Sequence, residues 1–263
     1  MKSLRFFVLT ALAVALLAAP VIAAGLTAEE IVEKANRASY YAGKDGKADI
    51  VMTITAADGS TRSREFTMLR LNDEGDDQKF YVYFQAPADV RKMAFLVWKN
   101  AGRDDDRWLW LPALNLKKRI APGDKRTSFV GSDFFYEDVS GRGTDEDNHS
   151  LQEETADAYV LRSEPKDADA VEFAWYQVWI DKQTFLPMKA IYYDRQGQAY
   201  RQVEALKVET IDDHPTVIEA KAADLKAGTS TVNSFSNISY DNGFNSRIFT
   251  ERFLRRPPRE VGN

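Results

Sequence analysis

The chain has 263 residues, no cysteine and only two histidines, and its 35 basic and 40 acidic side chains give a net charge of −5. Without cysteine it can form neither disulfides nor thiolate metal sites, and the acidic balance argues against a general nucleic-acid binder. A chain of this length can bury a core large enough to be stable by packing alone.

The first 23 residues have the pattern of a secretory signal peptide. Two basic residues precede an apolar run over residues 6–19, and a stretch of small residues suited to cleavage ends at Ala23. The apolar run is shorter than the roughly 18 residues that a membrane-spanning helix needs. We therefore expect cleavage after Ala23, export to the periplasm, and a single domain over residues 24–263.

The mature chain is expected to begin with an amphipathic helix. Thr27 and Glu30 have the spacing of a capping box, and apolar residues recur at helical intervals as far as residue 39. The period then changes to two over residues 50–55, and Asp58-Gly59 suits a hairpin turn. A helix followed by a β-hairpin is the predicted start of the domain.

Most of the remaining sequence predicts strands separated by turns, without helices long enough for parallel crossovers. Two later segments look helical, residues 133–139 after a Ser132 cap and residues 246–254. The predicted fold class is mainly β with a few helices (α+β), built on a large antiparallel sheet. The further candidate strands are residues 79–85, 94–99, 107–111, 116–120, 159–163, 175–180, 188–193, 200–210, 217–224 and 229–240.

Apolar and aromatic side chains fall on both faces of two of these strands, residues 80–84 and 175–180. A sheet with one solvated face would alternate apolar with polar residues, so both faces of these strands must be covered. Two interpretations stay open. Other segments of the chain can cover the second face, or that face can line a cavity for an apolar ligand.

No catalytic pattern is recognisable in the sequence. His149 and His214 each lack a second histidine or a spaced carboxylate that would suit a metal. Ser132 has no G-x-S-x-G context, and residues 141–143 begin but do not complete a dinucleotide fingerprint. We expect a protein that is not an enzyme and that needs no metal or other cofactor.

The segment over residues 129–139, Phe-Val-Gly-Ser-Asp-Phe-Phe-Tyr-Glu-Asp-Val, carries a family resemblance. It closely resembles the G-S-D-F-x-Y-E-D signature of the outer membrane lipoprotein-sorting protein family, a LolA-like group of the LolA/LolB superfamily. Residues 87–93, 108–114 and 249–254 agree with the same family. In order and spacing these stretches cover nearly the whole mature chain.

The resemblance implies a half-open antiparallel β-barrel whose apolar concave face is partly closed by a helical lid or plug. It implies a monomeric periplasmic carrier that shields lipid or lipoprotein acyl chains and passes them between envelope membranes. The implied partners are an inner-membrane RND-type exporter and an outer-membrane acceptor. This chain is longer than true LolA carriers, so the implied cargo is lipid in general. The alternative is an RseB-like sensor or adaptor that binds envelope proteins or lipoproteins and regulates a partner.

Three groups of residues are candidates for a site. A lipid cavity is expected to be lined by Ile50, Met52, Ile54, Phe66, Met68, Phe80, Val82, Phe84, Leu109 and Leu111. The signature is expected to form a lid, or alternatively a helix cap and core plug, through Gly131, Ser132, Asp133, Phe134, Phe135, Tyr136 and Asp138. A cationic rim for a headgroup or partner is expected at Lys117, Lys118, Arg119, Lys125 and Arg126. A second basic cluster comprises Arg252, Arg255, Arg256 and Arg259.

Overall fold

The computed structural model describes residues 25–262, and the predicted signal peptide over residues 1–23 lies outside them. Its α-helices are α1 (Ala28–Tyr40), α2 (Tyr136–Ser140) and α3 (Arg252–Arg255), and its 3-10 helices are η1 (Pro112–Leu114), η2 (Pro122–Asp124), η3 (Ser246–Ile248) and η4 (Arg259–Val261). The strands are β1 (Asp45–Thr55), β2 (Thr61–Asn72), β3 (Gln78–Ala86), β4 (Ala94–Lys99), β5 (Asp106–Leu111), β6 (Leu116–Ile120), β7 (Asp147–Glu154), β8 (Ala158–Pro165), β9 (Trp175–Asp181), β10 (Pro187–Tyr193), β11 (Ala199–Ile211), β12 (His214–Asp224) and β13 (Thr229–Tyr240).

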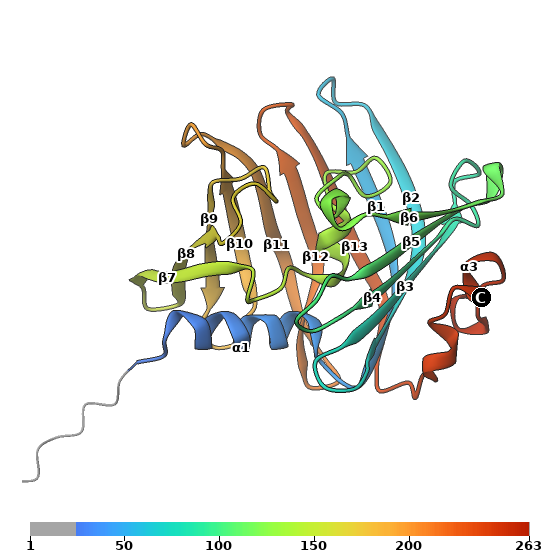
Figure 1. Cartoon of the computed structure of the whole chain (residues 1–263), viewed down its shortest axis with the longest axis horizontal. Coiled ribbons are helices and arrows are strands. Elements are labelled where there is room, and N and C mark those ends of the chain that lie inside the picture. The colour runs from blue at the N-terminus through green and yellow to red at the C-terminus, as the bar shows by residue number, and fades with distance from the viewer. Residues whose placement is uncertain (1–24, 263) are drawn as a thin grey trace, which may run out of the picture.

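All of these strands form one antiparallel sheet of 13 strands, in the order β6-β5-β4-β3-β2-β1-β13-β12-β11-β10-β9-β8-β7. Two runs of neighbouring strands, β1 to β6 and β7 to β13, are joined where β1 pairs with β13. The sheet is strongly curved but does not close, because β6 and β7 both remain edge strands (Figure 1). This confirms the predicted fold class and the half-open antiparallel barrel.

Helix α1 crosses one end of the concave face (Figure 1). Its first turn is fixed by the predicted capping box, in which Glu30 N–H donates to the Thr27 hydroxyl at 3.2 Å and Thr27 N–H donates to the Glu30 carboxylate at 2.8 Å. Its buried residues Ile31 and Ala35 pack with β8 and β9. The helix therefore covers the half of the concave face that lies toward β7.

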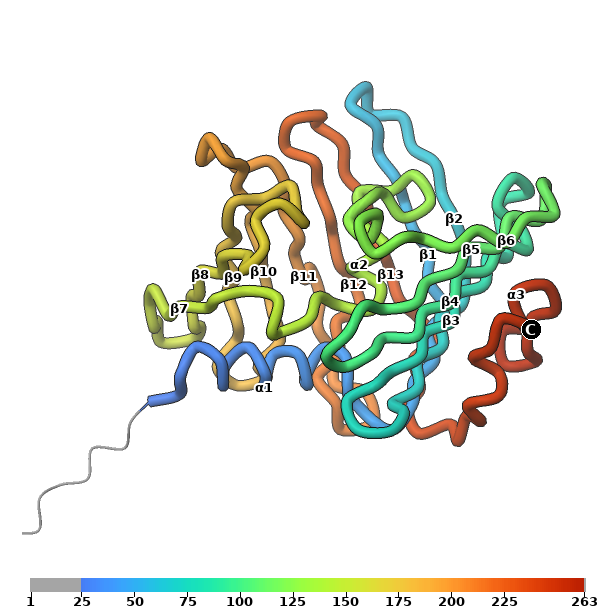
Figure 2. Tube along the Cα trace, in the orientation of Figure 1, coloured from blue at the N-terminus to red at the C-terminus, as the bar shows by residue number. Residues whose placement is uncertain are grey.

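A plug, residues 121–140, lies across the other half of the concave face and ends in α2 (Figure 2). Its aromatic rings enter the concave core, where the Phe129 and Phe95 ring centroids are 5.4 Å apart and those of Tyr136 and Phe95 are 5.2 Å apart. The plug thus fills with its own side chains a surface that would otherwise be open to water.

The predicted helix over residues 133–139 is shorter than expected, and Ser132 is not its cap. Val130 and Gly131 have positive φ angles of 47° and 78°, and the chain turns there instead of entering a helix. The Ser132 hydroxyl donates to the Phe129 carbonyl at 2.7 Å, within that turn. The helix begins at Tyr136, where the carboxylate of Asp138 accepts the N–H of Phe135 at 2.6 Å.

The C-terminal segment, residues 244–262, covers the convex face of β2 to β5 on the outer side of the barrel (Figure 1). Phe249 is 0% exposed and packs in one cluster with Leu96 and Trp108. The indole of Trp98 donates to the Phe249 carbonyl at 2.7 Å, and the Tyr81 hydroxyl donates to the Phe253 carbonyl at 2.8 Å. The doubly apolar character of residues 80–84 therefore comes from two covers, the plug inside and this segment outside.

The helix expected over residues 246–254 is interrupted. The chain forms the 3-10 helix η3 and then the single turn α3, with Phe249 between them. Because Ile248, Phe249 and Leu254 must all reach the convex face of the sheet, the segment follows the sheet surface and does not form a regular helix. None of the described helices has both the length and the apolar character needed to cross a bilayer.

Candidate functional site

An apolar cavity of about 380 Å³ opens in the concave face, between the C-terminal end of α1 and the plug. Strands β10 to β13 form one wall, and β1 to β3 form another. Phe129, Phe134 and Val139 of the plug close it on one side, and Tyr40 of α1 on another. The cavity thus lies over a part of the sheet that neither α1 nor the plug covers.

The hollow exists because the strands beneath it carry small side chains. Ala48 on β1, Ala190 on β10, Ala205 on β11 and Ala220 on β12 all line the cavity. Protein interiors are close-packed, so a region of short side chains on a curved sheet leaves unfilled space unless another element enters it. Here no element does, and the remaining walls are mostly apolar.

A few polar groups accompany these apolar walls. Arg70 of β2 is among the lining residues, together with Asp138 of the plug. The side-chain oxygen of Asn233 also faces this region, buried and without a hydrogen-bond partner among the described residues. An apolar space with a small number of charged and polar groups suits an amphiphile with a long apolar part.

The ten residues predicted to line a lipid cavity all belong to or pack against the concave core. Phe66, Met68 and Phe80 line the cavity itself. The others are covered by the plug and by one another, so they form its surrounding core. These are Ile50, Met52, Ile54, Val82, Phe84 and Leu109, which are buried, and Leu111, which is partly buried.

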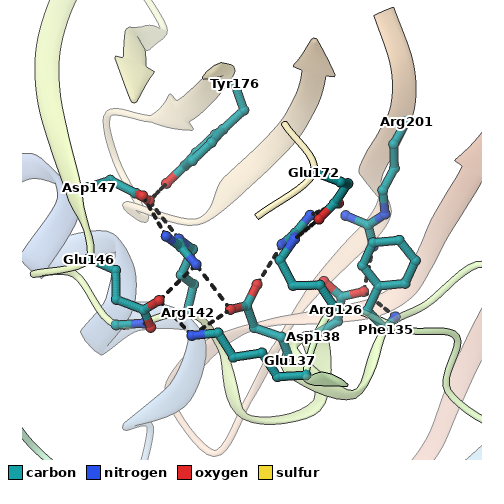
Figure 3. A network of polar contacts seen from close by, with 12 residues as sticks. Arg126, Phe135, Glu137, Asp138, Arg142, Glu146, Asp147, Glu172, Tyr176 and Arg201 are labelled. Carbon is teal, nitrogen blue, oxygen red and sulfur yellow. Dashed lines mark hydrogen bonds and ion pairs between the residues drawn. The ribbon is translucent and has the colours of Figure 1, made fainter. Parts of the chain in front are cut away.

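The plug is held in place by a network of buried charges around Glu137 (Figure 3). The Glu137 carboxylate accepts from the Arg126 guanidinium at 2.5 Å and lies 3.2 Å from that of Arg142. Arg142 also pairs with Asp147 of β7 at 2.7 Å. Burial would raise the pKa of Glu137, but Arg126, Arg142 and Lys125 outweigh it and lower the pKa to about 2.

Two further acids of the signature tie the plug to the sheet. The Asp133 carboxylate accepts from the hydroxyls of Thr229 and Thr231 on β13, with 2.6 Å to Thr231. Asp138 pairs with Arg201 of β11, which is 3% exposed and stacks 4.1 Å from the centre of the Phe135 ring. The signature therefore works in this structure as a plug with three acidic tethers.

The five basic residues predicted to form a rim do not lie together. Lys117, Lys118 and Arg119 are exposed on β6, at the edge of the sheet. The structure contradicts the exposed placement of the other two. Arg126 is 9% exposed and is held by Glu137 and Glu172, and the partly buried Lys125 pairs with Glu137 and Glu146. Their acidic partners lie up to 46 residues away in the sequence, so no local pattern predicts this burial.

No group of three or more histidine or carboxylate side chains within residues 25–262 is arranged to hold a metal ion. His149 hydrogen-bonds Ser163 at 2.8 Å and the Thr144 carbonyl at 2.9 Å, so both ring nitrogens serve the local structure.

Three comparisons place this arrangement among known proteins. A protein-family model, described as an uncharacterized protein, matches residues 76–256. The crystal structure of a DUF1329 family protein from Desulfovibrio piger is similar, with 28% identity and a TM-score of 0.79 over 86% of this chain and 97% of that one. No curated protein matches the chain.

Two other solved structures share the fold. An outer membrane lipoprotein-sorting protein domain from Vibrio parahaemolyticus has 28% identity and a TM-score of 0.79, over 87% of this chain and 98% of that one. A LolA superfamily protein from Nitrosomonas europaea has 20% identity and a TM-score of 0.68, over 87% of this chain and 100% of that one. The likeness extends over most of the chain in each case.

Proposed function

The chain belongs to the LolA-like family of outer membrane lipoprotein-sorting proteins, and on that premise we propose that it is a periplasmic carrier of lipid or lipoprotein acyl chains. The observation that carries this proposal is the apolar cavity of about 380 Å³ in the concave face. Its size is near the lower end of the roughly 300–1,000 Å³ typical of small-molecule sites. As it stands, it suits a ligand of fatty-acid size.

The energetics favour a carrier that works without chemistry. Each methylene of an acyl chain gains about 0.8 kcal/mol on leaving water for an apolar site. The walls of the cavity supply such a site, and the few polar groups among its lining residues can meet a headgroup. In this proposal the cargo enters and leaves the cavity by exchange with membranes or partner proteins. The proposed partners are an RND-type exporter and an outer-membrane acceptor.

Saturable binding of a fluorescent fatty acid tests the proposal. The parent protein should bind about one ligand per chain with micromolar or tighter affinity. Ala220→Phe, which places a ring inside the cavity, should weaken binding at least tenfold. Ala223→Phe is the matched control, because its neighbour Ala222 faces the concave core and alternate residues of a strand face opposite sides of a sheet.

The control should bind like the parent. Folded parent protein without saturable binding would contradict the carrier proposal. A stable complex with an envelope protein, formed by a chain that binds no fatty acid, would support the adaptor alternative in its place.

A further inference from the structure

The hairpin that joins β5 and β6 exposes two leucines at its tip. Leu114 in η1 is 69% exposed and Leu116 at the start of β6 is 45% exposed. Asn115 between them has a positive φ of 47°, which turns the chain back on itself. Much of the surface of these two large apolar side chains is left uncovered by residues 25–262, so it is available to an apolar environment outside the protein.

Basic residues follow this tip along β6 and occur in the neighbouring C-terminal segment. On β6 the next three residues are Lys117, Lys118 and Arg119, all exposed. Lys117 pairs with Glu251 and Arg119 with Asp106. The exposed arginines of the C-terminal segment add four charges that have no carboxylate at ion-pair distance within residues 25–262. They are Arg252, Arg255, Arg256 and Arg259.

Contacts between the two segments hold the C-terminal segment beside the β5–β6 hairpin. The Lys117–Glu251 ion pair joins β6 to the C-terminal segment, and the Arg255 guanidinium lies 4.9 Å from the centre of a Trp110 ring on β5. Trp110 pairs with Lys117 in the ladder, and the next pair along is Leu111 with Leu116. The C-terminal segment, with Arg255, therefore lies against the β5–β6 hairpin that carries the two leucines (Figure 1).

We propose that this edge, the leucine tip with its flanking cations, docks the protein onto an anionic lipid bilayer. The chain as a whole is acidic, with a net charge of −5, so a local excess of cations beside exposed leucines gives one surface a preference for negative membranes. The leucines enter the interface between headgroups and acyl chains, and the cations bind anionic headgroups. None of these residues lines the apolar cavity, so docking is separable from cargo binding.

Cosedimentation with vesicles of phosphatidylethanolamine, with and without phosphatidylglycerol, tests the proposal. The parent should bind the anionic vesicles, with affinity that falls as salt rises, because exposed charges are screened over about 10 Å at 0.1 M salt. Replacing Arg252, Arg255 and Arg256 by Gln should lower the partition coefficient about 100-fold at low salt, because each surface cation contributes roughly 1 kcal/mol. Leu114→Ser with Leu116→Ser should lower it about tenfold.

Matched control variants remove the same number of basic residues and leucines from other parts of the surface. Lys166, Arg195 and Lys207 are exposed on other parts of the molecule, and changing all three to Gln removes three charges without touching the tip. Leu206 and Leu225 are 44% and 45% exposed and serve as the leucine control. Both control variants should bind vesicles like the parent.

Equal binding of neutral and anionic vesicles, or equal losses in the tip and control variants, would overturn the proposal. If the arginine variant loses vesicle binding and the leucine variant does not, the proposal is also overturned. That result would indicate a surface that binds an acidic protein, without insertion into a bilayer. Fatty-acid binding measured on the same samples separates this proposal from the carrier proposal, since either can fail alone.

Discussion

Glu137 is the buried acid around which the plug is fixed to the rest of the molecule. It is 2% exposed and meets cations from both ends of the plug region. Burial alone would favour its neutral form, and only the surrounding positive charge keeps it ionised. A carboxylate held in this way makes the plug sensitive to any change that removes a charge from the network.

The low pKa of Glu137 predicts acid sensitivity. Its pKa is about 2 in the folded protein and 4.5 in an ordinary setting, so the carboxylate stabilises the fold above about pH 4.5 and loses that contribution as the pH falls toward 2. The shift corresponds to roughly 3 kcal/mol. Urea unfolding should show the free energy of unfolding falling over this range, and Glu137→Gln should be less stable at pH 7 with a flatter pH dependence. Equal slopes for the two proteins would contradict this assignment.

Substitutions at Phe84 and Met68 should have different effects, although both residues are on the concave face. Phe84 is 0% exposed, with its ring centroid 5.0 Å from that of Phe66, and it does not line the cavity. Phe84→Asp should therefore cost several kcal/mol of folding stability, because a charge would be buried unpaired. Met68→Gln, at a partly exposed lining residue, should instead weaken fatty-acid binding more than it lowers the unfolding temperature. Comparable losses of stability in both variants would contradict this distinction.

The sequence could predict which residues face inward but not where the hollow lies. Large apolar residues such as Ile50 and Phe84 were natural candidates for a cavity lining, yet large side chains fill space. The hollow is found over the alanines of β10 to β12, where volume is missing. The alternation of apolar and polar residues shows which face of a strand points inward. The position of a cavity depends instead on how the side chains of all neighbouring elements pack together. Ala190, Ala205 and Ala220 are a signal that becomes informative only once the strands are placed.

At the scale of elements, the C-terminal segment should contribute strongly to stability although it forms little regular structure. Phe249→Ala would leave a void between this segment and the sheet and should cost about 3–5 kcal/mol. Phe253→Ala, at a partly buried ring of the same segment, should cost much less. Equilibrium urea denaturation of the two variants measures the difference. A small effect at Phe249 would mean that the segment is not a structural cover of the convex face.

The acidic tethers predict how firmly the plug is closed. Asp133→Ala removes the acceptor of two threonine hydroxyls on β13, and hydrogen bonds to charged groups contribute roughly 1.5–3 kcal/mol. Amide hydrogen exchange over residues 127–139 should accelerate, with little change in β8 or β9. Asp167→Ala, in an exposed loop, is the control and should leave exchange unchanged. Unaltered protection of the plug in Asp133→Ala would show that its apolar contacts alone hold it.

Strand β7 is the strand that the sequence did not predict. Its residues, Asp-Asn-His-Ser-Leu-Gln-Glu-Glu, show no apolar alternation, and Leu151 is 38% exposed. It forms because it pairs along β8, as in the pairing of Leu151 with Leu161. A polar edge strand of this kind owes its conformation to backbone pairing with a neighbour, which a local pattern cannot show. Its acidic end, Glu153 and Glu154, is the sort of charge that keeps an edge from pairing further.

For the molecule as a whole, the residues alone predicted a large antiparallel sheet covered on both faces, and they left open whether a cavity or other segments provide the cover. Both occur, in different places, but the convex side of β9 has neither, and Trp175 and Trp179 stay only partly buried there. The plug and the C-terminal segment cover β2 to β5, whereas part of β10 to β13 faces an apolar hollow. The half-open barrel itself followed from the resemblance of residues 129–139 to a known signature, since curvature without closure leaves no mark in local periodicity.

The carrier account is tested most directly by mass spectrometry of organic extracts from the protein purified out of its native periplasm. The account predicts acyl lipid in near-stoichiometric amount in the parent and in Ala223→Phe, and its loss from Ala220→Phe, whose added ring occupies the cavity. Absence of lipid from folded parent protein, or equal lipid in both alanine variants, would contradict the claim that this cavity carries acyl chains.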